Sequence, residues 1–249
     1  MQGWKNPGRL GALVYALGAL VLGGAATVVS RTRISKHRGR KRVIQGLPPG
    51  AIIIVSNHAS YADGILLALL CRRMGRSVRL LATAGVFRAP VIGWLARRVG
   101  FIPVERGLLQ AADALAPAAE ALAAGEAIGI FPEGRTTRNP EHWPERAKTG
   151  AVRLAVQSGA PIVPVAMVGT HRVLGRQHPL RSIVVNVVIR PEVLTAIGDP
   201  IDVRALAATT EPTPAQVREL ADHVMGRIVD LVAGLRGELA PHPNGVDPV

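Results

Sequence analysis

Short apolar runs alternate with amphipathic stretches over most of the chain after residue 43. Buried strands are predicted where successive residues are apolar, at 51–56, 78–83, 101–105, 127–131, 161–168 and 182–189. Helices are predicted where apolar residues recur at helical spacing, at 63–74, 90–99, 108–124, 150–159 and 214–236. Pro90 suits a first helical turn, Gly159 suits a helix end, and Pro117 predicts a kink or a restart. This alternation predicts an α/β fold, with a mixed, largely parallel sheet flanked by helices.

The first part of the chain has a different pattern. Residues 10–30 carry no charge and are long enough to cross a bilayer as a helix, although small residues near their end also allow a signal peptide. Residues 31–42 contain seven Lys and Arg, which favours the cytoplasmic side and anionic lipid. We therefore expect a membrane anchor with a basic segment at 1–42, a single folded domain at 43–238 on the cytoplasmic face of the cell membrane, and a flexible tail at 239–249. The pattern leaves open whether 10–30 spans the membrane or lies in its interface.

Composition narrows the range of partners. The chain has 249 residues and a net charge of +13, which favours anionic partners such as a phospholipid surface. Only eight residues are aromatic, two Tyr, three Phe and three Trp, so no platform for stacking bases is expected and no nucleic-acid partner is predicted. The one cysteine, Cys71, excludes an internal disulfide and a cysteine-based metal site.

His58 and Asp63 lie where the first buried strand gives way to a helix. Functional groups gather at such junctions in open α/β sheets. Five residues apart on one helix, the two side chains would point about 140° away from each other. They can meet if His58 is in the loop and the helix begins near Ser60, which stands three residues before Asp63 as in a capping box. The pair is then either a base with its orienting carboxylate or a turn histidine beside a helix cap; no metal site is expected.

Three further strand ends carry polar or special residues. Arg106 follows the apolar run 101–104 and has the geometry to bind a phosphate, or to pair with Glu105 on the surface. Glu133 and Gly134 follow the run 127–131. Either Glu133 accepts a hydrogen bond from a substrate hydroxyl while Gly134 lets the backbone come close, or the two residues form an ordinary turn at the end of a strand. Pro164 interrupts 161–168, which predicts an edge strand, a bulge or an opening in the backbone.

Taken together, these stretches resemble the four ordered motifs of the 1-acylglycerol-3-phosphate acyltransferase family. The likeness covers about residues 40–190 and rests on Asn57-His58-x4-Asp63, on Gly100 to Arg106, on Phe131-Pro132-Glu133-Gly134 and on Ile162 to Val165. It implies the glycerolipid-acyltransferase fold, and transfer of an acyl chain from acyl-CoA or acyl carrier protein to the free hydroxyl of a lysophosphatidate-like acceptor. Phosphatidate is the implied product, and no metal or bound cofactor is implied.

The resemblance also implies roles for individual residues. His58 corresponds to the general base and Asp63 to its orienting carboxylate. Substrate binding is implied for the remaining matched positions: Asn57, Arg106, Glu133, Gly134, Arg135, Lys148 and Pro164. The family usually has Thr-Arg after the glycine of the third motif, whereas this chain has Arg135-Thr136, so the Arg135 side chain is expected to point elsewhere. Backbone N–H groups near 57–60 or Gly134 are the candidate donors for an oxyanion. A different lyso-lipid, polyol or amine acceptor is the alternative.

Residues 86–100 mix apolar and basic side chains. Phe87 and Trp94 alternate with Arg88, Arg97 and Arg98, which is typical of a membrane-facing helix. The alternative is an ordinary amphipathic helix that packs Val91, Ile92 and Leu95 into the core.

Overall fold

The structure is a computed structural model of the chain, and it describes residues 4–34, 46–104, 112–174, 179–209 and 211–237. Its centre is a sheet whose order is β1-β7-β6-β2-β5-β3-β4 within these ranges. The strands are β1 (Arg31–Ile34), β2 (Ile52–Ser56), β3 (Val78–Thr83), β4 (Ile102–Val104), β5 (Ala127–Ile130), β6 (Ile162–Val168) and β7 (Glu192–Ile197). Neighbours pair in parallel except β6 and β7, which are antiparallel. The predicted mixed, largely parallel sheet is confirmed.

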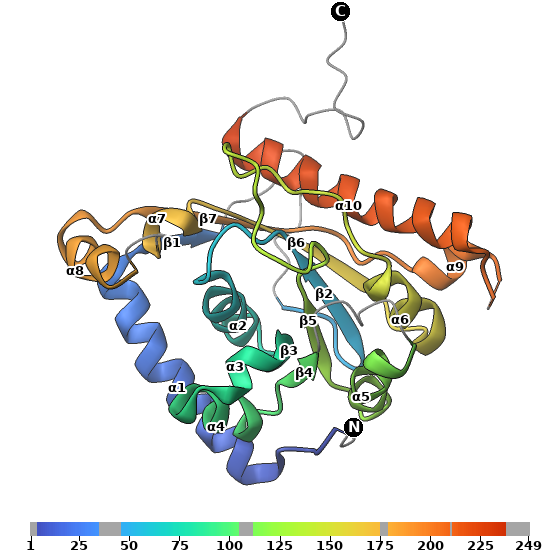
Figure 1. Cartoon of the computed structure of the whole chain (residues 1–249), viewed down its shortest axis with the longest axis horizontal. Helices are drawn as coiled ribbons and strands as arrows, with labels where there is room; N and C mark the ends of the chain where they lie inside the picture. Colours follow the sequence, from blue (N-terminus) through green and yellow to red (C-terminus); the bar gives the residue numbers. More distant parts are fainter. Residues whose placement is uncertain (1–3, 35–45, 105–111, 175–178, 210, 238–249) are drawn as a thin grey trace, which may run out of the picture.

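Helices cover both faces of the sheet (Figure 1). They are α1 (Gly8–Val29), α2 (Asp63–Arg73), α3 (Ala84–Arg88), α4 (Pro90–Arg98), α5 (Ala112–Ala123), α6 (Gly150–Ser158), α7 (Thr170–Val173), α8 (Pro179–Ile189), α9 (Val203–Ala207) and α10 (Pro214–Arg236). α5, α6, α9 and α10 pack on one face, and α2 packs on the other with the C-terminal end of α1 beside it.

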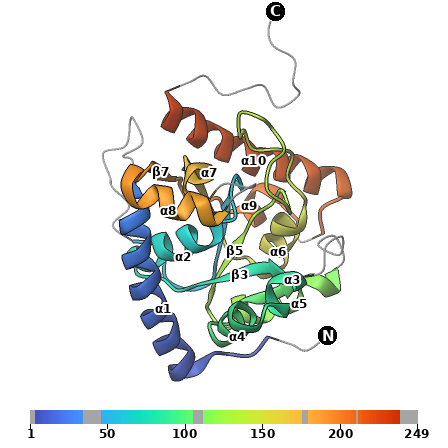
Figure 2. The same cartoon turned by 60° about the vertical axis from the view of Figure 1, so that its left-hand side comes forward.

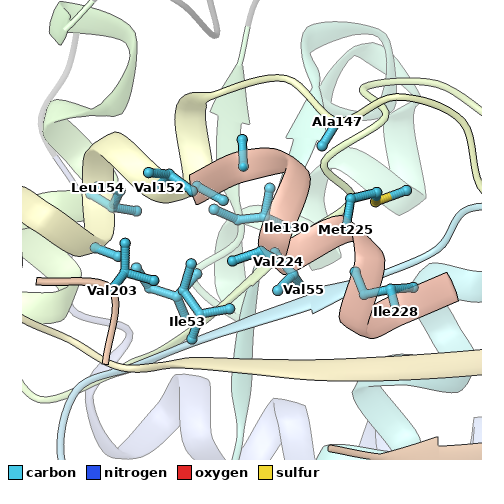
Figure 3. Packing of buried hydrophobic residues seen from close by; sticks show 14 of the residues in the cluster. Ile53, Val55, Ile130, Ala147, Val152, Leu154, Val203, Val224, Met225 and Ile228 are labelled. Atoms are coloured by element: carbon cyan, nitrogen blue, oxygen red, sulfur yellow. The ribbon is translucent and has the colours of Figure 1, made fainter. Parts of the chain in front are cut away.

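The alternation of side chains along β2 builds two cores. Ile53 and Val55 point into the cluster under α6 and α10, shown in Figure 3. Ile52 and Ile54 point into the cluster under α2. All four are fully buried, because β2 lies in the middle of the sheet with helices above and below. A strand buried on both faces reads as a continuous apolar run, which is why "AIIIVS" is so apolar.

The predicted strand at 182–189 is wrong. These residues belong to the helix α8, and the strand of this region is β7, which begins after Pro191. An apolar run of eight residues does not distinguish a strand from a helix by its period. The valines of α8 are exposed, so they do not occupy buried positions in the sheet.

Other boundaries differ in smaller ways. Arg31–Ile34, expected within a basic segment, form the edge strand β1, and the rest of 31–42 lies outside the described residues. α5 runs from Ala112 to Ala123 without a break, with Pro117 inside it. α2 begins at Asp63 and not near Ser60. Residues 108–111 and the tail 239–249 lie outside the described residues.

One helix is long and apolar enough to cross a membrane among the described residues. It is α1, with a mean hydropathy of 2.1, and 6% of its most apolar window is buried against the rest of the protein. The helix qualifies by its length and composition alone, and a signal sequence meets the same two criteria.

Candidate active site

The candidate site lies at the carboxyl ends of the central strands. β2 is flanked by β5 and β6, and all three run in the same direction, so the loops that follow them meet at one edge. His58 follows β2, Glu133 follows β5, and the turn containing Gly169 follows β6. Functional groups of open α/β folds gather at this edge.

His58 and Asp63 are in contact. Nδ1 of His58 lies 2.8 Å from Oδ2 of Asp63, and the same oxygen accepts a hydrogen bond of 2.7 Å from the N–H of Ser60. Asp63 is completely buried at the first position of α2, where a carboxylate also interacts favourably with the helix dipole. The loop at 57–62 thus lets the pair meet, as the spacing required. A carboxylate at Nδ1 favours the tautomer that leaves Nε2 as an acceptor.

The ring of His58 is held on one face and open at one edge. Phe131, at the end of β5, stacks on it with ring centroids 4.3 Å apart and an interplanar angle of 22°. The side chain retains 19% of its exposure. Within the part of the chain that the structure describes, no group bonds Nε2. His58 therefore presents a nitrogen lone pair toward the accessible side of the site.

The loop after β5 fixes the backbone of His58 from two sides. Oε1 of Glu133 accepts a hydrogen bond of 2.8 Å from the His58 N–H. The N–H of Thr137 donates to the His58 carbonyl oxygen at 2.7 Å. Both polar groups of this one peptide position are thus held by the same neighbouring loop. The role of Thr137 was not predicted from the sequence, because its contribution comes from a backbone N–H that every residue type except proline supplies.

Glu133 is buried, and both of its oxygens contact backbone donors. Its second oxygen, Oε2, accepts from the N–H of Glu145 at 3.1 Å. Burial raises the pKa of Glu133 to about 7, although the two backbone hydrogen bonds oppose this change. Each oxygen thus has a backbone donor inside the protein, so a substrate hydroxyl would have to share an oxygen that is already engaged. The carboxylate instead ties the loop after β5 to the loop that carries His58.

Asn57 directly follows β2, and Pro164 lies within β6. The Asn57 side chain donates to the carbonyl oxygen of Met167 at 2.9 Å and accepts from the Met167 N–H at 2.8 Å, which joins β2 to β6 below the site. Pro164 is buried and lies opposite Val55 in an internal strand. The expectation of an edge strand for Pro164 is wrong, since β6 lies between β2 and β7.

The remaining substrate-binding candidates cluster beyond Glu133. Gly134 has φ of +70°, and a side chain there would meet the end of Lys148, which packs against it. Arg135 forms an ion pair with Glu145, so its guanidinium already has an anionic partner. Arg106, the candidate phosphate ligand, lies outside the described residues.

Several candidate oxyanion donors are engaged inside the protein. The N–H groups of His58 and Ser60 donate to Glu133 and Asp63, and that of Gly134 donates to Phe131. The oxyanion formed when a thioester carbonyl is attacked would therefore need hydrogen-bond donors other than these three N–H groups.

A second histidine at the same edge was not foreseen. His171, in α7 directly after β6, stacks on His142 with ring centroids 4.0 Å apart. Burial, helped by the neighbouring His142, lowers the pKa of His171 to about 4, so it is neutral at physiological pH. The sequence could have indicated His171 by its position, because it follows the end of β6 as His58 follows the end of β2.

No three His, Cys, Asp or Glu side chains gather as a metal site anywhere in the described ranges. A small, mainly apolar cavity lies behind Phe131, lined by Leu81, Leu115, Ile130, Phe131, Pro132, Lys148, Gly150 and Ala151.

The sequence around this site also matches a known protein family. The family model described as Acyltransferase matches residues 36–168, more than half of the chain, and the chain belongs to this family. The matched region contains His58, Asp63, Glu133 and Pro164.

Two relatives and one solved structure are similar to this chain. A chloroplast 1-acyl-sn-glycerol-3-phosphate acyltransferase of Brassica napus is 32% identical over 123 residues, which are 49% of this chain and 34% of that protein. The lyso-ornithine lipid O-acyltransferase of Pseudomonas aeruginosa is 33% identical over 129 residues, 51% of this chain and 46% of that protein. The crystal structure of the 1-acyl-sn-glycerophosphate acyltransferase PlsC from Thermotoga maritima has the same fold, with a TM-score of 0.61 and 21% identity over 90% of this chain and 80% of that chain. The chain thus matches about a third to a half of the length of these curated relatives.

Proposed function

We propose that this protein transfers an acyl chain from a thioester, acyl-CoA or acyl carrier protein, to the free hydroxyl of 1-acylglycerol-3-phosphate, giving phosphatidate for phospholipid biosynthesis at a membrane. The observation that carries the proposal is the His58–Asp63 contact, with Nε2 of His58 free of partners in the described chain. Relatives named for this reaction support the choice of acceptor.

The reaction follows from the lone pair on Nε2. His58 takes the proton of the acceptor hydroxyl as the hydroxyl oxygen attacks the thioester carbonyl carbon. The carbon–sulfur bond then breaks, and the imidazolium returns its proton to the leaving thiolate. Asp63 stabilises the imidazolium that forms between these steps. General-base catalysis of this kind contributes about 10²–10⁴-fold.

The backbone clamp on His58 has a role in this scheme. Glu133 and Thr137 hold the His58 peptide, so the ring keeps its position while Nε2 exchanges a proton. We propose Glu133 as a positioning residue for His58. Asn57 acts in the same sense, by fixing the end of β2 against Met167.

Phosphate recognition is proposed for Arg106, with Lys148 beside Gly134 as a second cation near the site. The apolar cavity behind Phe131 is a candidate start for an acyl-chain pocket, because it opens next to the ring that stacks on His58. Since the acceptor is a lipid, α1 and the surrounding basic residues are proposed to hold the enzyme at the cytoplasmic face of the cell membrane.

A second acceptor class is favoured by two observations. The relative named for a lyso-ornithine lipid is as similar to this chain as the relatives named for lysophosphatidate. In addition, Arg135 is paired with Glu145, which competes with a phosphate for its guanidinium. An acyltransferase for another lyso-lipid is therefore the second candidate.

Thiol release separates these possibilities. The purified protein is incubated in detergent with palmitoyl-CoA or palmitoyl carrier protein and 1-acylglycerol-3-phosphate, and then with lyso-ornithine lipid as the acceptor. Wild type is expected to release thiol and form phosphatidate, while His58→Ala loses at least about 100-fold in kcat. His223→Ala, which removes an exposed histidine on α10, is the matched control and should retain activity. Turnover with lyso-ornithine lipid alone would favour the second candidate, and equal activity of His58→Ala and wild type would exclude the proposed base.

A further inference from the structure

The loop that joins β2 to α2 is attached to the segment after β6 at two points. The Asn57 side chain bonds both backbone groups of Met167, and the Ser60 hydroxyl donates to the carbonyl oxygen of Leu174 at 3.0 Å. α7 lies between these two attachments, and its residue Val173 shares a buried cluster with the apolar side chains of α2. α7 and α2 are thus on the same side of the sheet (Figures 1 and 2). The first residues of α7 therefore lie near the loop that carries the candidate base.

Three polar atoms on these segments are buried, and no group within the described ranges bonds them. They are Oδ1 of Asp63, Oγ1 of Thr170 and Nδ1 of His171. Asp63 and Thr170 are each 0% exposed. The other carboxylate oxygen of Asp63, Oδ2, has two partners, His58 and the Ser60 N–H. Buried polar atoms almost always have a hydrogen-bond partner, from the protein or from an ordered water, so three such atoms on adjoining segments indicate a shared partner outside the chain.

Asp63 and His171 are close enough to interact. Burial is the largest influence on the pKa of His171, which falls to about 4, and the negative charge of Asp63 acts against this change. Thr170 adjoins His171 in the sequence, so its hydroxyl lies in the same region. Since His171 is neutral at physiological pH, its Nδ1 is either a single donor or a single acceptor.

A single water satisfies a set of atoms of this kind. A buried water makes about three hydrogen bonds. It can donate to the carboxylate oxygen, accept from the threonine hydroxyl, and either donate to or accept from the imidazole nitrogen, according to the tautomer of His171. The side chains do not favour a metal ion here, because no three His, Cys, Asp or Glu gather in the part of the chain that the structure describes.

We propose that one buried water joins Oδ1 of Asp63 to the Thr170 hydroxyl and to Nδ1 of His171, and that Thr170 and His171 are positioning residues for the pair of His58 and Asp63. The water and the hydroxyl hold the second carboxylate oxygen, so Oδ2 stays on Nδ1 of His58 while Nε2 takes and returns a proton. The catalytic part of this role rests on the proposed function, whereas the water site does not.

A crystal structure at a resolution that shows ordered water tests the site without turnover. Thr170→Val keeps the shape of the side chain and removes its hydroxyl, whereas Thr170→Ser keeps the hydroxyl. Wild type and Thr170→Ser are expected to show one water within about 3.2 Å of all three atoms. In Thr170→Val the water should be lost or displaced, and the distance from Nδ1 of His58 to Oδ2 of Asp63 should exceed about 3.2 Å. Absence of the water from wild type, or an unchanged contact between His58 and Asp63 in Thr170→Val, would overturn the proposal.

Thiol release measures the effect on catalysis. Thr170→Val is expected to lower kcat at least about fivefold and to leave the KM of both substrates within about twofold, because Asp63 acts on the imidazolium that forms during the reaction and not on substrate binding. Thr170→Ser should retain at least about half of the wild-type kcat. Thr195→Val is the matched control, since it removes a buried hydroxyl of β7 that donates to the Arg33 carbonyl oxygen, and kcat should not change. An equal loss of kcat in Thr170→Val and Thr170→Ser would mean that the hydroxyl is not responsible.

His171→Phe is a second variant that guards against misfolding of the first. It keeps a ring that can stack on His142 and removes Nδ1, so kcat should fall at least about threefold at an unchanged KM and unfolding midpoint. If both folded variants turn over as wild type does, Thr170 and His171 have no positioning role. If wild type releases no thiol with any acceptor, the proposed function fails, and the crystal structures still show whether the water holds Asp63 in place.

Discussion

Replacing Glu133 by Gln tests whether the fold holds a buried carboxylate between two backbone donors. Gln has the same shape but only one oxygen, so either the His58 N–H or the Glu145 N–H loses its acceptor. Leaving a buried N–H unpaired costs about 1–3 kcal/mol. This cost does not depend on pH, because neither the amide nor the two N–H groups titrate.

A second effect depends on pH. Burial raises the pKa of Glu133 from 4.5 to about 7. Since the pKa in the folded state is the higher one, the folded protein binds the proton more tightly than the unfolded chain. The resulting stability is fully present below pH 4.5 and is lost as the pH rises to about 7. At 1.36 kcal/mol for each tenfold change in proton affinity, the loss amounts to about 3 kcal/mol.

The two effects make opposite contributions at neutral pH. At pH 4.5 we expect Glu133→Gln to be less stable than wild type by about 1–3 kcal/mol. Between pH 4.5 and 7.5 the wild type loses about 3 kcal/mol relative to the variant, so the difference should vanish or change sign. Denaturant unfolding in detergent at pH 4.5, 5.5, 6.5 and 7.5 measures this.

The control is Glu219→Gln, which makes the same chemical change at an exposed position on α10. Its difference from wild type gives the effect of losing a surface carboxylate and is subtracted. If the Glu133→Gln and wild-type curves stay parallel after this correction, Glu133 does not have a raised pKa and the proposed burial of its carboxylate is wrong.

Three further predictions concern the site and the strand ends. Asp63→Asn should keep the hydrogen bond from Ser60 but lower kcat at least about 100-fold in the thiol-release assay, because the imidazolium loses its counter-charge; a KM effect alone would contradict this. Gly169→Ala should destabilise the protein by at least about 2 kcal/mol in denaturant unfolding, because φ is +90° and the new Cβ meets the carbonyl oxygen of Glu192, whereas Gly226→Ala, with open space in α10, should stabilise it by about 0.5–1 kcal/mol. Arg135→Met should change the KM for lysophosphatidate less than about threefold, because Arg135 is already paired, and a tenfold rise would make it a phosphate ligand.

The sequence predicted the parts of the site that depend on local spacing. His58 and Asp63 are five residues apart, so the contact between them required only a loop before α2, which the structure contains. The clamp on His58 depends instead on Glu133 and Thr137, which are far from it in the sequence. Their contacts exist because β5 lies beside β2, and strand order is not visible in the pattern of a single chain.

The role of Glu133 shows the same limit. A carboxylate after a strand end suggests a ligand for substrate, and the family likeness implied this as well. Whether its oxygens face a substrate or a neighbouring loop depends on the path of residues 135–148, where the Glu145 N–H donates to Glu133 and the Glu145 carboxylate pairs with Arg135. No periodicity describes such a loop, so only the fold reveals that both oxygens are engaged.

The wrong prediction of a strand at 182–189 has a physical cause. Hydrophobic periodicity identifies apolar residues, but burial in a core and exposure to lipid satisfy it equally. Valines side by side suggest a strand only if their surroundings are a sheet. Within residues 181–189, Asn186 is the one buried side chain; it bonds the carbonyl oxygens of Arg172 and Val173 in α7, and the valines are exposed. A helix with this arrangement is stable in water only at the cost of an exposed apolar surface, whereas a leaflet removes that cost. The prediction of a strand failed because it assumed that every apolar run in the chain is buried by protein.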